Sequence, residues 1–190
     1  MRFEKSINNY LRTLQDTISA IDRSEIDVYL EILMTAYEQD ATIFIFGNGG
    51  SAATASHFAT DFNKGISYGL DKRFRVMALT DNFSTVSAYS NDTSYDDVFI
   101  EQIKNFIKDK DIAIGISGSG NSKNVIKAIE YANSRGNTTV GITGYDGGIL
   151  RKIAKFSVNA NVKDMQISED IHMILCHLSM KVLDSFIKLK

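Results

Sequence analysis

Short apolar runs that alternate with helical patterns are the feature that most limits how this chain can fold. Five runs rich in β-branched or aromatic residues have this character: residues 42–46, 74–79, 111–116, 138–142 and 156–158. Hydrophobic residues at helical spacing mark several of the segments between them. Strands that are apolar on both faces are typical of parallel sheets, whose crossover helices cover both faces. We therefore predict an α/β fold: a single doubly wound domain with a mainly parallel five-stranded sheet flanked by helices.

The two ends of the chain predict helices that pack on this sheet. Residues 1–40 hold two helical patterns, which indicate an N-terminal hairpin packing on the core or on a neighbouring subunit. Ser24 is the expected N-cap of the second helix. Residues from about 167 to 189 predict a long amphipathic C-terminal helix. Three acids of this last segment are expected to be solvated: Asp164, Asp170 and Asp184. Without linkers or repeats, residues 1–190 are expected to form one domain.

Charge and cysteine content exclude several classes of function. The formal net charge is −2 and the basic residues are scattered, so we expect no nucleic-acid or membrane partner. No apolar run is long enough to cross a bilayer, and no signal peptide is evident. The single cysteine, Cys176, rules out an intrachain disulfide and a cysteine-built zinc knuckle. We expect it to be buried, in a cytoplasmic protein.

Two glycine-rich loops at predicted strand ends are suited to hold an anion. The first, residues 47–51, reads Gly-Asn-Gly-Gly-Ser, and the second, residues 117–122, reads Ser-Gly-Ser-Gly-Asn-Ser. Their glycines let backbone N–H groups turn into one concavity, and a helix begins after each loop. Either loop alone could be an ordinary strand-to-helix turn. Two of them at the same edge of one sheet favour binding of a phosphate.

Sequence patterns around these loops narrow the kind of phosphate compound. The P-loop pattern is missing, and we expect no nucleotide cofactor. Gly47, Gly49 and Ala52 do fit the weak dinucleotide fingerprint. That fingerprint expects an acid about 20 residues on, whereas the acid at the second strand end, Asp81, lies farther along. A serine-rich second loop suits a single terminal phosphate better than a nicotinamide dinucleotide.

Taken together, these segments resemble the sugar isomerase (SIS) domain family and, within it, the phosphoheptose isomerases. The resemblance covers nearly the whole chain and rests on five stretches: residues 47–51 followed by 57–59, 91–92, 115–122, 142–148, and the helix that holds His172 and His177. It implies a ketose–aldose isomerase that converts sedoheptulose 7-phosphate into a heptose phosphate. It also implies a homotetramer and one divalent metal ion per subunit, with zinc expected.

The resemblance assigns roles to particular residues. Catalysis falls to Asp61 as the base and His177 as the acid. A metal would lie near His57, Asp61, His177 and Glu169. Substrate binding falls to Asn48, Gly49, Gly50, Ser51, Asn91, Asp92, Ser117, Gly118, Ser119, Ser122 and Glu169. This chain departs from the family pattern at three positions: Asp61 replaces a glutamate, Glu169 a glutamine, and Gly118 a frequent threonine.

The residues themselves support part of this assignment. His57 and Asp61 are spaced i, i+4 on a predicted helix, so they share a face. The pair could hold a divalent cation, act as a base with its neighbour, or form a plain surface hydrogen bond. Glu169 and His177 are eight residues apart, a rise of about 12 Å on one helix. If both serve one site, either the helix begins after Glu169 or the two come from different subunits. We therefore expect an active site at a subunit interface.

A second reading of the chain comes from another class of protein. Some sugar isomerase domains are non-catalytic and act as sugar-phosphate sensors or as scaffolds for a partner protein. Such members tend to lose the acid and the final-helix histidine, whereas this chain keeps Asp61 and His177. That favours the enzyme. His172 lies about 140° around the helix from His177, so we expect it in packing or at an interface.

Overall fold

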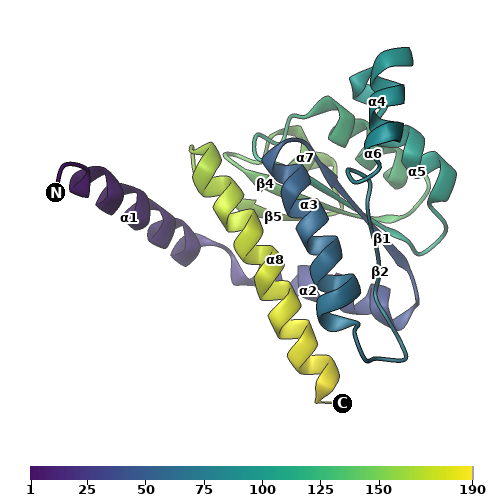
Figure 1. Ribbon diagram of the computed structural model, residues 1–190, viewed down its shortest axis with the longest axis horizontal. Helices are drawn as coiled ribbons and strands as arrows, with labels where there is room; N and C mark the ends of the chain where they lie inside the picture. Colours follow the sequence, from purple (N-terminus) through teal and green to yellow (C-terminus); the bar gives the residue numbers. More distant parts are fainter. Residues whose placement is uncertain (190) are drawn as a thin grey trace.

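The computed structural model describes residues 1–189 and confirms the predicted α/β fold around one parallel sheet (Figure 1). The sheet has the order β2-β1-β3-β4-β5, and every neighbouring pair of strands is parallel. Its strands are β1 (Thr42–Gly47), β2 (Arg75–Ala78), β3 (Ile112–Ser117), β4 (Thr138–Gly144) and β5 (Phe156–Ala160). All five lie where the apolar runs predicted them.

Helices cover both faces of this sheet, as the apolar strands require. The α-helices are α1 (Glu4–Ala20), α2 (Arg23–Glu38), α3 (Gly50–Thr60), α4 (Phe83–Asp92), α5 (Ile100–Phe106), α6 (Lys123–Ser134), α7 (Gly148–Ile153) and α8 (Met165–Lys188). One face packs on α2, α3 and α8, and the other on α5, α6 and α7. Among the residues described, no helix is both long and apolar enough to traverse a bilayer.

Strand β1 shows why the sheet needs cover on both sides. Ile43 and Ile45 belong to the core beneath α2, α3 and α8, whereas Phe44 and Phe46 belong to the core beneath α5 and α6. These four side chains are at most 2% exposed. Burying a large apolar side chain stabilises a fold by about 1.5–3 kcal/mol, so β1 contributes to both cores at once. The continuous apolar run is the sequence signature of this two-sided burial.

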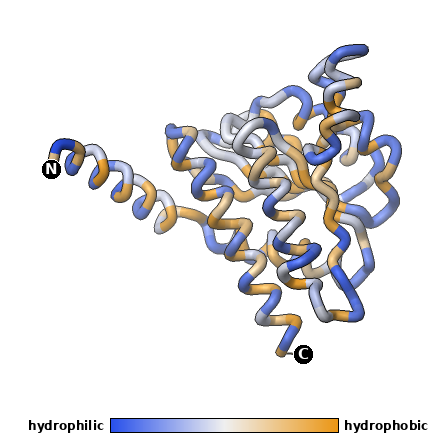
Figure 2. The backbone as a smooth tube through the Cα atoms, viewed as in Figure 1, coloured by the Kyte–Doolittle hydropathy of each residue, from blue (hydrophilic) through white to orange (hydrophobic). Residues whose placement is uncertain are grey.

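The two N-terminal helices form as predicted, but they do not make the predicted hairpin, because α1 has its main contacts with α8 and not with α2. Figures 1 and 2 show α1 projecting from the body, with apolar positions recurring along it. The short connection at Ile21 and Asp22 is extended, so the chain does not turn back on itself. Asp22, not Ser24, caps α2, because its carboxylate accepts hydrogen bonds from the Ser24 N–H and hydroxyl.

The three acids expected to be solvated all have partners. Asp164 caps α8 by accepting from the Ile167 N–H. Tyr10 of α1 donates its hydroxyl to Asp170, and Lys188 pairs with Asp184. All three are partly exposed, so they are solvated in part, and the sequence did not reveal the neighbours with which they also pair.

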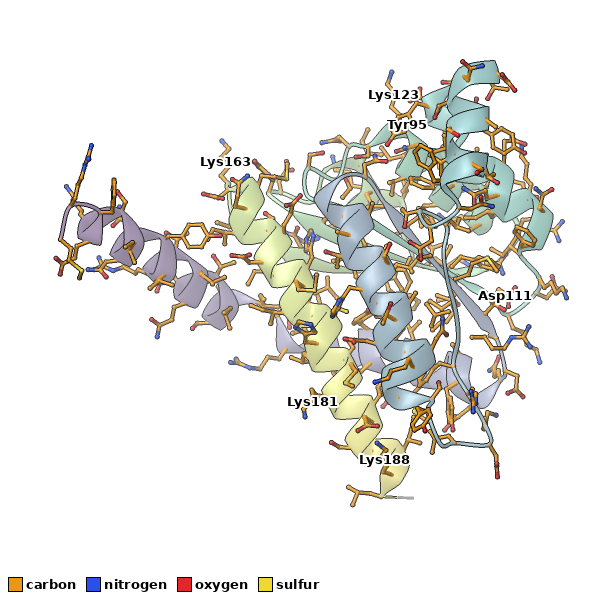
Figure 3. The ribbon with its side chains drawn as sticks, in the orientation of Figure 1. Tyr95, Asp111, Lys123, Lys163, Lys181 and Lys188 are labelled. Atoms are coloured by element: carbon orange, nitrogen blue, oxygen red, sulfur yellow. The ribbon has the colours of Figure 1, made fainter. Side chains whose placement is uncertain are left out.

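The topology brings the two glycine-rich loops together. β1 pairs with β2 on one side and with β3 on the other, so the connections from β1 and β3 leave the same edge of the sheet. In open parallel sheets such a switch point at the carboxyl ends of the strands is where ligands bind. Figure 3 labels Tyr95 and Lys123 on this side and Asp111, just before β3, toward the opposite edge.

Candidate active site

The loop after β1 is shaped by its glycines. Gly49 has φ +54 and ψ −120, a conformation that side chains disfavour, and α3 begins at the next residue. A side chain at Gly47 would meet the Cβ of Ser51 at 2.7 Å and the carbonyl of Ile116 at 2.8 Å. The loop therefore lies close against β3 and directs the first N–H groups of α3 toward the edge of the sheet. Ser51 itself is buried in the first turn of α3.

The loop after β3 gathers hydroxyl groups. The Oγ atoms of Ser117 and Ser122 lie 3.1 Å apart, and the Ser119 hydroxyl accepts from the Asn121 N–H. Gly118 faces the first turn of α8, where an added Cβ would collide with the Met165 sulfur. Hydroxyls and backbone N–H groups at a helix start form a ready cradle for phosphate oxygens.

The loop after β4 supports this cradle from behind. The Gly144 N–H donates to the Gly118 carbonyl, and the Leu150 N–H donates to the Gly120 carbonyl. A side chain at Gly120 would collide with the Gly147 carbonyl. The glycines of residues 144–148 thus allow the two loops to approach each other, which is a structural role.

Two histidines and an aspartate converge farther along α3, about 10 Å from its first turn at a rise of 1.5 Å per residue. His57 on α3 and His177 on α8 face each other with their Nε2 atoms 2.9 Å apart. The His57 Nε2 also lies 3.5 Å from an Asp61 oxygen, so the two residues share a face as their spacing predicted. One ligand atom from each of the three residues lies within 4.8 Å of the others. Both histidines are exposed and Asp61 is half-buried, so the cluster is open to a ligand.

Asp61 is the first residue after α3, at the point where the α-helix gives way to a π-helical turn. The α-helical part ends at Thr60, and residues Asp61–Ile66 continue as a π-helical turn. Such turns are rare and occur often at functional sites. The Cys176 sulfur lies 4.0 Å from the Asp61 carboxylate, and burial, with a smaller contribution from Asp61, raises the pKa of the Cys176 thiol to about 12. Cys176 is buried, as predicted.

Glu169 lies apart from this cluster. α8 begins at Met165, so Glu169 and His177 are on one continuous helix, and the alternative in which the helix starts after Glu169 is excluded. The Glu169 carboxylate points at the first turn of α3, where it would lie 2.5 Å from a side chain at Gly50. Within its own chain, the Glu169 carboxylate therefore lies next to the first loop. Its role as a metal ligand stays a prediction.

Asn91 and Asp92 end a helix, α4, that the sequence patterns did not reveal. The Asn91 side chain donates to the Asp92 carboxylate, and both residues are exposed. The chain then continues to Tyr95, whose hydroxyl donates to the Asn48 side chain of the first loop. This contact ties the region of Asn91 and Asp92 to the predicted sugar loop.

Sequence reasoning missed two parts of this edge. Asn124, in the first turn of α6, pairs with the Asn48 amide. Ser56 on α3 donates to Asp81, which follows β2. An asparagine two residues into a helix and an acid after a strand resemble ordinary surface residues. Their position next to two glycine-rich loops was the only available signal.

The described side chains and loops supply two kinds of group, those suited to bind an anion and those suited to move protons. The loops supply N–H groups and hydroxyls for a phosphate, Asn48 and Glu169 supply polar groups for a sugar, and the His57–Asp61–His177 cluster supplies a carboxylate and two imidazoles. A carboxylate and an imidazole at hydrogen-bonding range are the groups that general acid–base catalysis requires.

Comparison with known proteins agrees with this geometry. The model of the SIS domain family matches residues 3–144. A probable phosphoheptose isomerase of Thermoplasma volcanium is 34% identical over 180 residues, which cover 95% of this chain and 91% of that protein. The phosphoheptose isomerase of Geobacter metallireducens is 32% identical over 178 residues, covering 92% and 93%. The structure of a phosphoheptose isomerase from Neisseria gonorrhoeae matches with a TM-score of 0.87 at 29% identity, covering 97% of each chain. The chain therefore belongs to the SIS domain family and, within it, to the phosphoheptose isomerase group.

Proposed function

We propose that this protein is a ketose–aldose isomerase that converts sedoheptulose 7-phosphate into a D-glycero-D-manno-heptose 7-phosphate. Membership of the group makes the chain an isomerase, and the names of its relatives support this substrate. The observation that carries the proposal is the convergence of His57, Asp61 and His177 within 4.8 Å, along the helix that begins at the first glycine-rich loop. A phosphosugar sensor would need the loops but not this cluster.

The loops support a substrate held at both ends. The phosphate would lie among Ser117, Ser119 and Ser122, and the sugar would extend toward the first loop and Glu169. Fixing the phosphate end restricts the motion of the carbons at the other end, which lowers the entropic part of the barrier.

The reaction needs one proton moved between two carbons and another between two oxygens. The Asp61 carboxylate would take a proton from C1 of the ketose, and the C–H electron pair would form the C1–C2 double bond. His177 would donate a proton to the C2 oxygen as its carbonyl bond opens, giving a neutral enediol. Return of the first proton to C2 and removal of the C1 hydroxyl proton would give the aldose and restore both residues. His57, 2.9 Å from His177, would orient that imidazole.

The same three residues fit a divalent metal ion. Two imidazoles and a carboxylate are common zinc ligands, and Zn–N distances of about 2.0–2.1 Å would place two histidine nitrogens of one site about 3.3 Å apart. The observed 2.9 Å between the Nε2 atoms is close to this value. When bound, the ion would stabilise negative charge that develops on the substrate oxygens. Zinc is the ion we propose, and Asp61 and the Nε2 atoms of His57 and His177 would hold it, which would leave the Nδ1–H of His177 as its proton donor.

We also propose that the protein is a homotetramer with active sites at its interfaces. The support is α1, which projects from the body with exposed apolar side chains along one face, namely Ile7, Leu11 and Ile18. An uncovered apolar face of this kind is typical of an interaction surface. A cytoplasmic location stays a prediction from the sequence.

The test is turnover of sedoheptulose 7-phosphate by the purified protein, with chelator and with zinc added back. Loss of turnover on chelation and its return with zinc would support both the reaction and the metal. His177→Ala and Asp61→Asn should each lower kcat by about 100-fold or more while leaving binding of the sugar phosphate largely intact. Lys181→Ala, one turn further along α8, is the matched control.

Two outcomes would count against the proposal. Full turnover by His177→Ala would show that His177 is not the catalytic acid. Saturable binding of sedoheptulose 7-phosphate by the wild type without turnover, with zinc present, would instead identify a sensor.

A further inference from the structure

We propose that Asn124 is a positioning residue that joins the two substrate loops and fixes the orientation of the Asn48 amide. Asn124 is 1% exposed and lies in the first turn of α6, two residues after the phosphate loop ends. It does not stand among the residues to which the resemblance gives a role. The inference rests on the proposed function, because the ligand it concerns is a sugar phosphate that spans both loops.

The backbone decides which way the Asn124 amide points. The Val125 N–H donates to the Asn124 Oδ1 at 2.9 Å, so this side-chain oxygen faces the start of α6. With its oxygen placed in this way, Asn124 directs its Nδ2 toward Asn48. The backbone N–H therefore fixes which end of the Asn124 amide is the oxygen. In an isolated amide side chain either end could take that position.

Asn48 is oriented in turn by Asn124. The Asn124 Nδ2 donates to the Asn48 Oδ1, and the Asn48 Nδ2 donates back to the Asn124 Oδ1, each at 2.9 Å. Tyr95 donates its hydroxyl to the same Asn48 oxygen at 2.8 Å. An amide oxygen has two lone pairs, and both are used here. If the Asn48 amide were reversed, its Nδ2 would face the Asn124 Nδ2, and two hydrogen-bond donors would meet without an acceptor.

This network has two consequences for a ligand. It connects three segments of the site: the loop after β1, the loop after β3 through the start of α6, and the segment that follows Asn91 and Asp92. It also leaves the Asn48 side chain with one unused N–H and no free acceptor. Asn48 therefore meets a sugar only as a hydrogen-bond donor, toward a carbonyl or hydroxyl oxygen.

The experiment compares a ligand that spans both loops with one that needs a single loop. Affinities for sedoheptulose 7-phosphate and for inorganic phosphate are measured by calorimetry in the wild type, Asn124→Leu and Tyr95→Phe. Leucine has a similar size and no charge, so it does not repel phosphate. Asn137→Leu is the matched control, since Asn137 is also a buried amide donor but lies near Lys108 and Asp111, at the opposite end of the sheet.

We expect Asn124→Leu to lower the affinity for sedoheptulose 7-phosphate about tenfold or more. The unpaired Asn48 amide can then turn, and the two loops are no longer joined by a hydrogen bond. Tyr95→Phe should weaken it by a smaller factor. Inorganic phosphate should bind all three proteins within about twofold, and Asn137→Leu should bind both ligands like the wild type.

Equal affinity of folded Asn124→Leu for sedoheptulose 7-phosphate would overturn the inference. An equal fall in affinity for sedoheptulose 7-phosphate and for inorganic phosphate would also overturn it, because that result indicates general destabilisation of the protein. If Asn124→Leu does not fold, Tyr95→Phe decides, because Tyr95 is half exposed. A wild type that binds phosphate but not sedoheptulose 7-phosphate would refute the proposed substrate, and the positioning role for it would fail as well.

Discussion

His172 illustrates how burial sets the charge of a single side chain. It lies on α8 and is 1% exposed, which confirms the expectation of a packing role. Burial lowers the pKa of His172 from 6.5 to about 4, and the Thr143 backbone opposes this only in part. The folded protein therefore holds His172 neutral at pH values where the unfolded chain protonates it.

This difference predicts a loss of stability in mild acid. Between about pH 6.5 and 4 the unfolded state binds a proton that the folded state does not, so His172 lowers the free energy of unfolding as the pH falls. At pH 5 the loss is about 2 kcal/mol. Urea unfolding at pH 7 and pH 5 measures it, and His172→Leu should reduce the difference by that amount. An unchanged difference in the variant would show that His172 does not cause it.

Gly118 is explained by its neighbour in space. The resemblance implies a threonine here, but the Met165 sulfur takes the room that a Cβ would need. The sequence could show the substitution and not its reason, because Gly118 and Met165 are far apart along the chain.

The pair predicts a coupled effect of mutation. Gly118→Ala should destabilise the protein by about 1 kcal/mol or less, since only the flexible, half-buried end of Met165 must move. Met165→Ala should also destabilise it, yet the double variant should be more stable than the sum of the two changes predicts. Thermal or urea unfolding of the four proteins measures the coupling. Strict additivity would mean that Met165 shifts away at no cost.

Elements with a strong periodic pattern could be predicted from the sequence, and α4 could not. The three inner strands were evident because they are buried on both faces, the two edge strands because they are short β-prone runs, and α3 because a helix-forming stretch follows the glycine-rich loop. α4 has no buried residue, so nothing in its sequence marks an apolar face. The position of Glu169 beside Gly50 was equally hidden, because it depends on how α8 crosses α3.

The N-terminus of α8 gives a prediction at this scale. Asp164 caps the helix through the Ile167 N–H and so fixes the turn that carries Glu169. Asp164→Ala should cost about 1 kcal/mol of stability, whereas Asp164→Asn should cost little, since asparagine caps equally well. Urea unfolding of both variants is the measurement. Equal losses would show that the charge of Asp164, rather than its cap, matters.

For the whole molecule, α1 is the part that the single chain does not explain. Ile7 is 51% exposed and Leu11 56% exposed on one face of this helix, and Figure 2 shows apolar positions recurring along it. Tyr10 fastens the helix to Asp170 of α8, next in sequence to Glu169. The sequence predicted the apolar stripe, but the isolated chain does not contain the surface that would cover it.

Assembly through α1 is tested by changing this stripe. If the protein is the tetramer proposed above, Ile7→Ser combined with Leu11→Ser should convert it into smaller species, seen by light scattering after gel filtration. Arg12→Ser combined with Asp16→Ser changes another side of α1 without altering the net charge, and should leave the mass unchanged. A doubly substituted stripe that keeps the full assembly would place the interface elsewhere.

The parallel sheet also bears on how the chain reaches this structure. Each strand pairs only with strands remote in sequence, as when Ile43 meets Ile112, so the sheet cannot begin from a local hairpin. Chains dominated by such distant contacts fold slowly, because long loops must close first. The sequence contains no proline, which removes the isomerisation that often limits refolding. A slow refolding phase in the monomeric chain would therefore report the search for these distant strand pairings.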